Sequence, residues 1–224
     1  MFLPLRRGRR PPGDVQPGES APRRSGNQCD QGVTAEVVLQ EASTSRLFIL
    51  TGAPGSGKTA ILTQLTGEFR CEDEPAWEVL TEQRASGGRG TWDQDPSLFV
   101  HLLLKRSIRK YESARRTKQT ILFDRGIPDC VVYALRLSVD VAPSLDAVDS
   151  FRYEPEVLFL APWPDIYKTD AERIMSFDET VAFSETLRDV YQRSGYSLID
   201  LPHGSISDRA AFVRAFITRR TETA

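Results

Sequence analysis

Cysteine, histidine and long apolar runs are all scarce in this chain of 224 residues. The three cysteines, Cys29, Cys71 and Cys130, stand far apart, which argues against a disulfide framework or a zinc site and fits a reducing compartment. The two histidines, His101 and His203, are isolated in the sequence. No stretch approaches the roughly twenty apolar residues that a membrane-spanning helix needs. We therefore expect a cytoplasmic protein without a membrane span.

Net charge is small as well, at −2 from 29 basic and 31 acidic side chains. Proteins that bind nucleic acid through its phosphate backbone carry a marked excess of basic side chains. The charge balance therefore disfavours nucleic acid as the main partner. With 40% hydrophobic residues, the chain can form one domain with a substantial core.

The beginning of the chain offers little that a core could bury. It is rich in arginine and proline, as in Arg9-Arg10-Pro11-Pro12. An organelle transit peptide would share the arginines, but Asp14, Glu19 and the prolines disrupt an amphipathic helix. We predict a disordered N-terminal tail over residues 1–45 and one folded domain over residues 46–219.

A glycine-rich segment lies between an apolar run and a helical pattern. It reads Gly52-Ala53-Pro54-Gly55-Ser56-Gly57-Lys58-Thr59 and matches the phosphate-binding pattern at every defined position. The run Leu47-Phe48-Ile49-Leu50 before it predicts a buried strand, and residues 60–65 have helical spacing. An accidental glycine turn is the competing interpretation, and the flanking strand and helix argue against it.

This loop has a physical reason to hold a nucleotide. Its glycines let successive backbone N–H groups turn towards one anion, and the helix that begins near Lys58 adds the positive end of its dipole. Lys58 is expected to contact the β- and γ-phosphates, and the Thr59 hydroxyl to ligate Mg²⁺. Residues 52–59 are therefore predicted to bind ATP with Mg²⁺, and GTP is not excluded.

The rest of the domain alternates between strand and helix patterns. Short apolar runs that predict strands recur at residues 120–123, 157–160 and 197–199. Between them, Asp95-Pro96 and Ser176-Phe177-Asp178-Glu179 are typical helix starts. This order predicts an α/β fold with a three-layer, doubly wound parallel sheet.

Ligands of such folds lie beyond the carboxyl ends of the strands. Asp124 follows the run 120–123, on a strand expected beside the loop strand, and its carboxylate could hold Mg²⁺ or accept the proton of an attacking hydroxyl. The alternative is a cap for the helix that starts near Pro128. Arg125 either binds a phosphate or acceptor group, or forms an ion pair with Asp129.

A second strand end leads into a segment with proline, aromatic residues and two cations, Lys168 and Arg173. Both a mobile lid over the transferring phosphoryl group and an ordinary surface connection fit this composition. Arg173 is the better candidate, because a guanidinium can bridge two phosphate oxygens.

The acceptor is expected between the loop helix and the 120–123 strand. Glu78 and Arg84 are weak candidates for contacting it, near Trp77 and Trp92, whose rings could stack on a base. Core positions are the commoner place for tryptophan in a domain of this size. The helix over residues 105–116 has a basic face that either solvent or an anionic substrate would contact.

Three segments together resemble the AAA-type ATPase-like domain of bacterial predicted ATPases, of the nicotinamide-riboside-kinase part of an NAD-synthesis regulator, and of a GTP- and lipid-binding trafficking protein of animals. They are residues 52–59, 123–129 and 167–173. The resemblance spans about Arg46 to Ile217 and implies a P-loop fold like that of nucleoside and nucleotide kinases, with Asp124 near the acceptor and Arg173 in a lid. Nicotinamide riboside is not carried over, because the loop is not serine-rich and Asp124-Arg125-Gly126 departs from that enzyme's pattern.

Three functions remain open. The favoured one is a kinase that transfers the γ-phosphoryl group of ATP to a small, nucleoside-like hydroxyl compound, with Lys58, Asp124 and Arg173 as catalytic residues. The second is a nucleotide-hydrolysing switch that acts through a partner. The sequence has no Asn-Lys-x-Asp motif and no Asp-x-x-Gly at Asp124, which weakens a GTPase form of this switch. The third, which the net charge disfavours, is a nucleic-acid end kinase.

Overall fold

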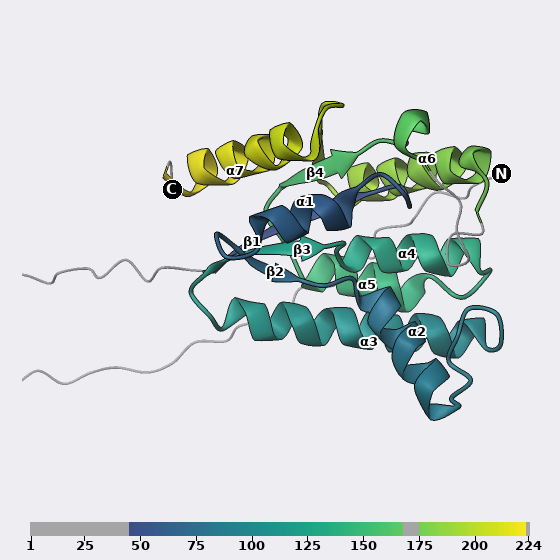
Figure 1. The fold of residues 1–224 in the computed structure, drawn as a ribbon. Coiled ribbons are helices and arrows are strands. Elements are labelled where there is room, and N and C mark those ends of the chain that lie inside the picture. The colour runs from purple at the N-terminus through teal and green to yellow at the C-terminus, as the bar shows by residue number, and fades with distance from the viewer. Residues whose placement is uncertain (1–44, 168–174, 223–224) are drawn as a thin grey trace, which may run out of the picture. The chain divides into compact units, whose positions relative to one another are not determined.

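The computed structural model describes residues 45–167 and 175–222. Five parallel strands form one sheet in the order β2-β3-β1-β4-β5 (Figure 1). The strands are β1 (Arg46–Gly52), β2 (Arg70–Glu72), β3 (Thr120–Asp124), β4 (Glu156–Leu160) and β5 (Ser197–Asp200). The predicted tail lies outside the described residues, apart from Ser45.

Seven α-helices connect the strands in the part of the chain that the structure describes. They are α1 (Lys58–Leu65), α2 (Pro75–Ser86), α3 (Pro96–Arg115), α4 (Ile127–Arg136), α5 (Ala142–Ser150), α6 (Phe177–Arg193) and α7 (Ile206–Glu222), with a short 3₁₀ turn, η1 (Pro164–Ile166). None of the described helices is long and apolar enough to cross a membrane.

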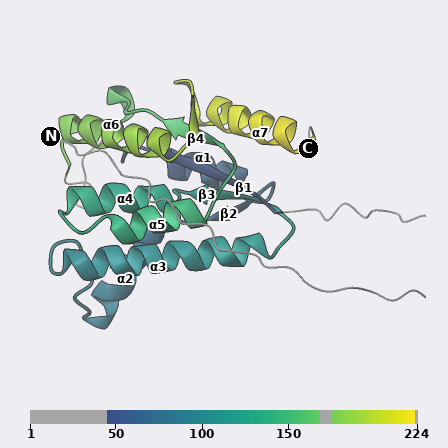
Figure 2. The ribbon, with the colours of Figure 1, turned by 180° about the vertical axis from the view of Figure 1, so that it is seen from behind.

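Strand β1 has an apolar side chain on both faces because helices cover the sheet on both sides. Leu47 and Ile49 belong to the larger core, together with side chains from α2 to α6. Phe48 and Leu50 belong to the smaller core, which α1 and α7 close. Figures 1 and 2 show these two helices on one side of the sheet and α3 and α4 on the other. The three-layer, doubly wound fold is therefore confirmed.

Local signals place the helix starts where the sequence predicts them. Helix α3 begins at Pro96, and the Asp95 carboxylate accepts a hydrogen bond from the backbone N–H of Leu98 at 3.0 Å. At the start of α6, Ser176 and Glu179 form the reciprocal capping box. These caps satisfy N–H groups that the first helical turn leaves unpaired.

Strand β2 and helices α2 and α5 are absent from the sequence prediction. Strand β2 has only three residues, and two of them, Arg70 and Glu72, form an ion pair at 2.8 Å, so no apolar run marks it. Because β2 is parallel to β3, the residues after Glu72 reach the same edge of the sheet as Asp124. This edge contains a carboxylate that the sequence analysis did not consider, that of Glu74.

Candidate active site

The phosphate-binding pattern forms the turn between β1 and α1. Gly55 and Gly57 have φ angles of 75° and 88°, which glycine adopts without the strain of a Cβ atom. Helix α1 starts at Lys58, directly after this turn. Strand, glycine turn and helix therefore follow one another as the motif requires, and the unpaired N–H groups of α1 face the turn.

Gly52, at the end of β1, has no room for a side chain. Its φ is +144°, and a Cβ there would lie 2.2 Å from the backbone oxygen of Leu160 in the neighbouring strand β4. A backbone carbonyl cannot move aside as the tip of a flexible side chain can. The close approach of β4 therefore explains glycine at this position.

We expect Gly52→Ala to destabilise the fold by about 2–5 kcal/mol, from steric overlap and backbone strain together. Gly67→Ala is the matched control, because Gly67 also has a positive φ, +101°, but nothing lies within 4 Å of its added Cβ. Strain alone should cost that variant about 1–2 kcal/mol. Urea unfolding measures both, and equal losses would contradict the steric explanation.

Lys58 is the cation inside the loop. It is only 6% exposed, and its Nζ donates to the carbonyl oxygens of Gly52 at 3.2 Å and Ala53 at 3.0 Å. Burial, together with the nearby charge of Arg125, lowers the pKa of Lys58 to about 8. Thr59, the next residue, is exposed at the first turn of α1.

Asp124 ends β3 directly beside the loop strand, where it pairs in register with Leu50. It is 5% exposed, and among the buried side-chain atoms of the described residues its Oδ1 is one of four without a hydrogen-bond partner. Burial raises the pKa of Asp124 to about 6, against the opposing attraction of Lys58. A buried acceptor without a partner is costly in a folded protein, which makes this atom a candidate for ligand contact.

The capping alternative for Asp124 is wrong. Gly126 is the N-cap of α4, and its backbone N–H donates to the Asp129 carboxylate at 3.0 Å. Asp124 is therefore not used by the helix that follows it. In the described residues no group of three or more acidic, histidine or cysteine side chains could hold a metal ion. Mg²⁺ in nucleotide sites needs only one or two protein ligands, and Asp124 with Thr59 fits that requirement.

Arg125 forms the ion pair that was one of its two predicted roles. It is 5% exposed with φ 70°, and its Nη1 contacts Asp129 at 2.9 Å and the Gly52 carbonyl at 3.1 Å. Its Nε donates to Glu74 at 2.8 Å. Arg125 thus connects the start of the phosphate loop to two acids, one on each side.

Asp129 is the centre of this buried network. It accepts hydrogen bonds from Thr51 at 2.9 Å and from the hydroxyl of Tyr191 at 2.5 Å, as well as from Arg125 and the Gly126 backbone. It bonds to Thr51 directly and to the Gly52 carbonyl through Arg125, and Thr51 and Gly52 are the last two residues of β1. The network fixes the position from which the phosphate loop begins.

Glu74 is a second carboxylate near Lys58 and Asp124. It lies at the N-terminal end of α2 and also accepts a hydrogen bond from the Tyr133 hydroxyl at 3.3 Å. Burial alone would raise the pKa of Glu74, but Arg125 and Lys58 outweigh burial and lower it. The acidic run before Pro75 was the available signal for this residue, and without β2 its position could not be inferred.

The predicted lid residues Lys168 and Arg173 lie outside the described residues. The segment that leads to them does reach the loop. A Cβ at Gly55 would lie 2.9 Å from the Tyr167 ring, and one at Gly57 would lie 3.6 Å from Ile166. Ile166 and Tyr167, which follow β4, therefore pack against the phosphate loop.

The structure does not bring Glu78 and Arg84 to the loop. Glu78 forms ion pairs with Arg106 at 2.9 Å and Lys110 at 2.5 Å, and so joins α2 to α3. Arg84 is exposed in the last turn of α2, ten residues and about 15 Å of helix beyond Glu74. The contact between α2 and the residues at the loop therefore comes from Glu74 at its N-terminal end.

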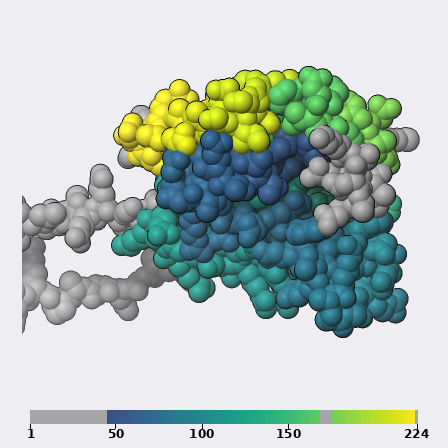
Figure 3. Space-filling model, in the orientation of Figure 1, coloured from purple at the N-terminus to yellow at the C-terminus, as the bar shows by residue number. Residues whose placement is uncertain are grey.

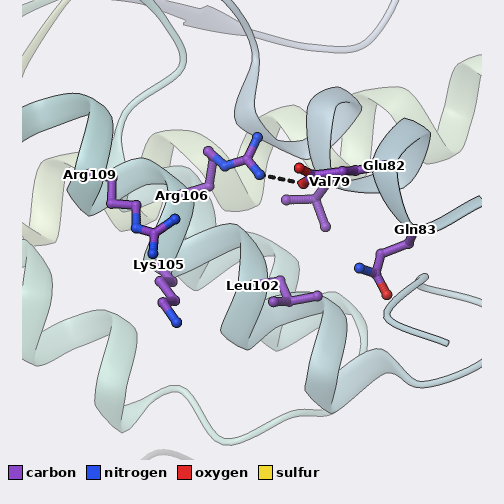
Figure 4. Close-up of a pocket in the computed structure, with 7 residues that line it drawn as sticks. All are labelled: Val79, Glu82, Gln83, Leu102, Lys105, Arg106 and Arg109. Carbon is purple, nitrogen blue, oxygen red and sulfur yellow. Dashed lines mark hydrogen bonds and ion pairs between the residues drawn. The ribbon is translucent and has the colours of Figure 1, made fainter. Parts of the chain in front are cut away.

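The basic face of α3 borders a pocket of about 230 Å³ against α2, away from the loop. Figure 4 shows the seven residues that line it: Val79, Glu82, Gln83, Leu102, Lys105, Arg106 and Arg109. Arg106 contacts Glu82 as well as Glu78, so acids already neutralise part of the basic face.

The two tryptophans of this region are not core residues. The side chains of Trp77 and Trp92 are 46% and 37% exposed, so the alternative that placed them in the core is wrong.

The sequence matches a family model described as an AAA domain over residues 47–209. No curated protein matches this sequence. Among solved structures, the NadR protein in complex with NR is similar, with a TM-score of 0.51 and 17% identity. That match covers 72% of this chain and 46% of the NadR chain, so it corresponds to less than half of NadR. At this identity it shows a shared fold.

Two more distant structures are kinases. Deoxyadenosine kinase from M. mycoides with bound dATP is 12% identical, with a TM-score of 0.47, over 77% of this chain and 99% of that one. Shikimate kinase from Acinetobacter baumannii in complex with shikimate is 17% identical, with a TM-score of 0.48, over 80% and 96%.

Proposed function

This chain belongs to the AAA domain family, and on that premise we propose that it is a nucleoside triphosphate-dependent kinase. It would bind ATP on residues 52–59 and transfer the γ-phosphoryl group to the hydroxyl of a small, nucleoside-like compound. The observation that carries the proposal is the buried Asp124, whose Oδ1 has no partner within the described residues, on the strand next to the phosphate loop.

The nucleotide side of the site consists of the loop and the start of α1. Backbone N–H groups of residues 52–59 and the α1 dipole would bind the phosphates, and Lys58 would add a charge near the β- and γ-phosphates. Lys58 is already held within the loop by the Gly52 and Ala53 carbonyls. Little rearrangement separates this position from a phosphate oxygen in the same turn.

The acceptor side contains the carboxylate. In the transfer, the acceptor oxygen forms a bond to the γ-phosphorus, the bond from that phosphorus to the bridging oxygen breaks, and the nucleoside diphosphate leaves. The hydroxyl proton must go to a base, and Asp124 can accept it in its ionised form. Lys58 balances the negative charge that the transferred group carries.

Thr59 and Asp124 are the residues that would hold Mg²⁺, directly or through water. When bound, the ion would neutralise phosphate charge and orient the γ-phosphoryl group. Asp124 acts in its ionised form both as a metal ligand and as the proton acceptor. Either role therefore requires that the Asp124 carboxylate be deprotonated.

Part of the proposal rests on sequence alone. We assign Lys168 and Arg173 to a lid over the phosphates, and residues 46–219 to one nucleotide-binding domain that follows a disordered tail over residues 1–45. The scattered cysteines favour the cytoplasm as its compartment. Deletion of residues 1–44 should leave the melting temperature unchanged, because the tail contributes no core residue in this assignment.

Thermal-shift and turnover assays on the full chain test the function. ATP and GTP are compared with Mg²⁺, and the preferred triphosphate is then combined with a panel of nucleosides, sugars and short oligonucleotides. The kinase predicts nucleotide consumption that depends on a small acceptor. Turnover that needs no acceptor would contradict it and favour the hydrolytic switch, and turnover that needs an oligonucleotide would favour the end kinase.

The pH dependence of kcat/KM should be bell-shaped, with limbs near pH 6 and pH 8. The pKa of Asp124 is raised to about 6, so below that pH the carboxylate binds a proton and loses its function. The pKa of Lys58 is lowered to about 8, so above that pH the ammonium charge is lost. Since kcat/KM reports the free enzyme, we expect its two limbs to follow the titration of these two groups. An acid limb that persists in Asp124→Asn would contradict its assignment to Asp124.

A further inference from the structure

A second buried arginine contacts the phosphate loop from outside the site described above. Arg209 lies in the first part of α7 and is 4% exposed. Its Nη2 donates to the Ser56 carbonyl at 2.9 Å, and a Cβ at Gly57 would lie 3.0 Å from its Nη1. Helix α7 (yellow) packs beside the blue segment that contains α1, as Figure 3 shows. The guanidinium therefore contacts the loop at residues 56 and 57.

Arg209 has no acidic partner in residues 45–167 and 175–222. None of the ion pairs there includes it, and its Nε is buried without a hydrogen-bond acceptor. Burial lowers its pKa, and no neighbouring carboxylate acts in the opposite direction. The other two cations at the loop differ, because Arg125 is paired with Glu74 and Asp129, and Lys58 lies near the Asp124 charge.

The guanidinium is held in place by an aromatic ring instead of an acid. Its carbon lies 5.6 Å from the centre of the Trp163 ring, and that ring stacks on His203 with 4.5 Å between centres and 4° between planes. Trp163 also donates from its Nε1 to Asp165 at 3.0 Å. The position of the charge is therefore fixed, although nothing in these contacts neutralises it.

A buried charge without a counter-ion is destabilising, so its retention needs another source of free energy. The carbonyl of Ser56 satisfies one N–H group but cannot balance the charge. A triphosphate bound on the inner side of the same turn would carry several negative charges to within a few atoms of Arg209. In a buried site that attraction is screened far less than in water.

We propose that Arg209 is a positioning residue for the phosphate loop whose counter-charge is the bound triphosphate. It fixes residues 56 and 57 through the Ser56 carbonyl and adds a positive charge behind them. This inference rests on the proposed function, because it requires that the loop bind a triphosphate.

Two substitutions test the charge. Arg209→Gln removes the charge and, because its side chain is two bonds shorter, also the hydrogen bond from Nη2 to the Ser56 carbonyl, whereas Arg209→Lys keeps the charge. The control is Arg214→Gln on the same helix, because Arg214 pairs with Glu68 at the surface. Affinities of the full chain for ATP, GTP and inorganic triphosphate, each with Mg²⁺, are measured by calorimetry. Inorganic triphosphate carries the phosphate charges of a nucleotide but has no nucleobase, so its affinity reports the contribution of charge alone.

We expect Arg209→Gln to weaken triphosphate binding roughly tenfold to a hundredfold, the range of a lost interaction between charged groups. Arg209→Lys should stay within about fivefold of the unaltered chain, and Arg214→Gln within about twofold. The loss in Arg209→Gln should be smaller for a nucleoside monophosphate than for a triphosphate. Its melting temperature without ligand should be unchanged or higher, because an unpaired buried charge is gone.

A merely structural role for Arg209 predicts the opposite pattern, and it would overturn the proposal. In that case Arg209→Gln melts at a lower temperature without ligand but loses no affinity that grows with ligand charge. If Arg209→Gln does not fold, a loss of more than tenfold in Arg209→Lys overturns the proposal, because the charge is still present. If the unaltered chain binds no triphosphate, the proposed function fails as well. If the unaltered chain and Arg214→Gln bind it and Arg209→Gln binds equally well, only this inference fails.

Discussion

Lys58→Ala is expected to lower triphosphate affinity by at least roughly a hundredfold and to remove turnover. The ammonium group is buried within the loop, and no other side chain of residues 52–59 is charged. Its loss removes the cation that residues 52–59 themselves supply, where the β- and γ-phosphates are proposed to lie. Calorimetric titration with ATP and Mg²⁺ measures the change in affinity.

The matched control for this prediction is Lys105→Ala. Lys105 is an exposed lysine on α3, so its removal changes the net charge equally without touching the loop. We expect its affinity to stay within about twofold. Binding by Lys58→Ala as tight as that of Lys105→Ala would show that residues 52–59 do not hold the phosphates.

Lys58→Ala has a second expected effect, on Asp124. The positive charge of Lys58 holds the pKa of Asp124 below the value that burial alone would give. Without Lys58 that pKa should rise further, so a larger fraction of the carboxylate would be protonated at neutral pH. Carboxyl titration followed by NMR in the two lysine variants tests this coupling directly, and an unchanged Asp124 would contradict it.

The loop was predictable because its signal is local. Gly55, Gly57 and Lys58 are fixed by the conformations and charges that an anion site needs within eight residues. Asp124 was predictable for a different reason, namely that parallel strands bring their carboxyl ends to one edge. Its pairing with Leu50 needed only the assumption that β3 lies next to β1.

The network beneath the loop was not predictable in the same way. Asp129 receives the Tyr191 hydroxyl across 62 residues, and Arg125 meets Glu74 across 51. Neither contact leaves a pattern in the sequence near either partner. Arg209 is a sharper case, since it lies 153 residues from the Ser56 carbonyl to which it donates. Such contacts follow from how the helices pack, which a single sequence does not specify.

Contact of Glu78 and Arg84 with an acceptor stays a prediction, and their distance from the phosphate loop was not predictable from the sequence. Both residues lie along one helix, so closeness in sequence to the loop does not imply closeness in space. Helix α2 begins at the site with Glu74 and then runs away from it, so each further turn adds about 5 Å. Glu78 instead pairs with basic residues of α3. The substrate-contacting residues are therefore better sought near Glu74 than farther along α2.

Asp124→Asn is expected to leave triphosphate affinity within about threefold and to lower the rate of transfer by roughly 10²- to 10⁴-fold, the contribution typical of a general base. The substitution keeps the size of the side chain and removes its charge and basicity. Because Oδ1 has no hydrogen-bond partner in the described residues, the change breaks no internal contact of that atom. The fold should therefore be unharmed, and removing a buried charge should even raise the melting temperature.

Asp129→Asn is the informative comparison, because it is the same chemical change five residues away. Asp129 is paired with Arg125 and accepts from Thr51, Tyr191 and the Gly126 backbone. Removing its charge leaves Arg125 with less compensation, so this variant should lose about 3–5 kcal/mol of stability. Two neighbouring aspartates should thus separate into one that supports the fold and one that supports the reaction.

The two variants together decide the role of Asp124. Urea unfolding measures the stability of each variant, and single-turnover experiments with a saturating triphosphate measure its rate of transfer independently. An Asp124→Asn protein that is stable, binds the triphosphate and does not transfer fits the proposed role. Undiminished turnover in that protein would rule out Asp124 as base and as metal ligand. The unpartnered oxygen would then be only a tolerated cost of the fold, and Glu74, whose charge also interacts with Lys58, would be the next carboxylate to test in the mechanism.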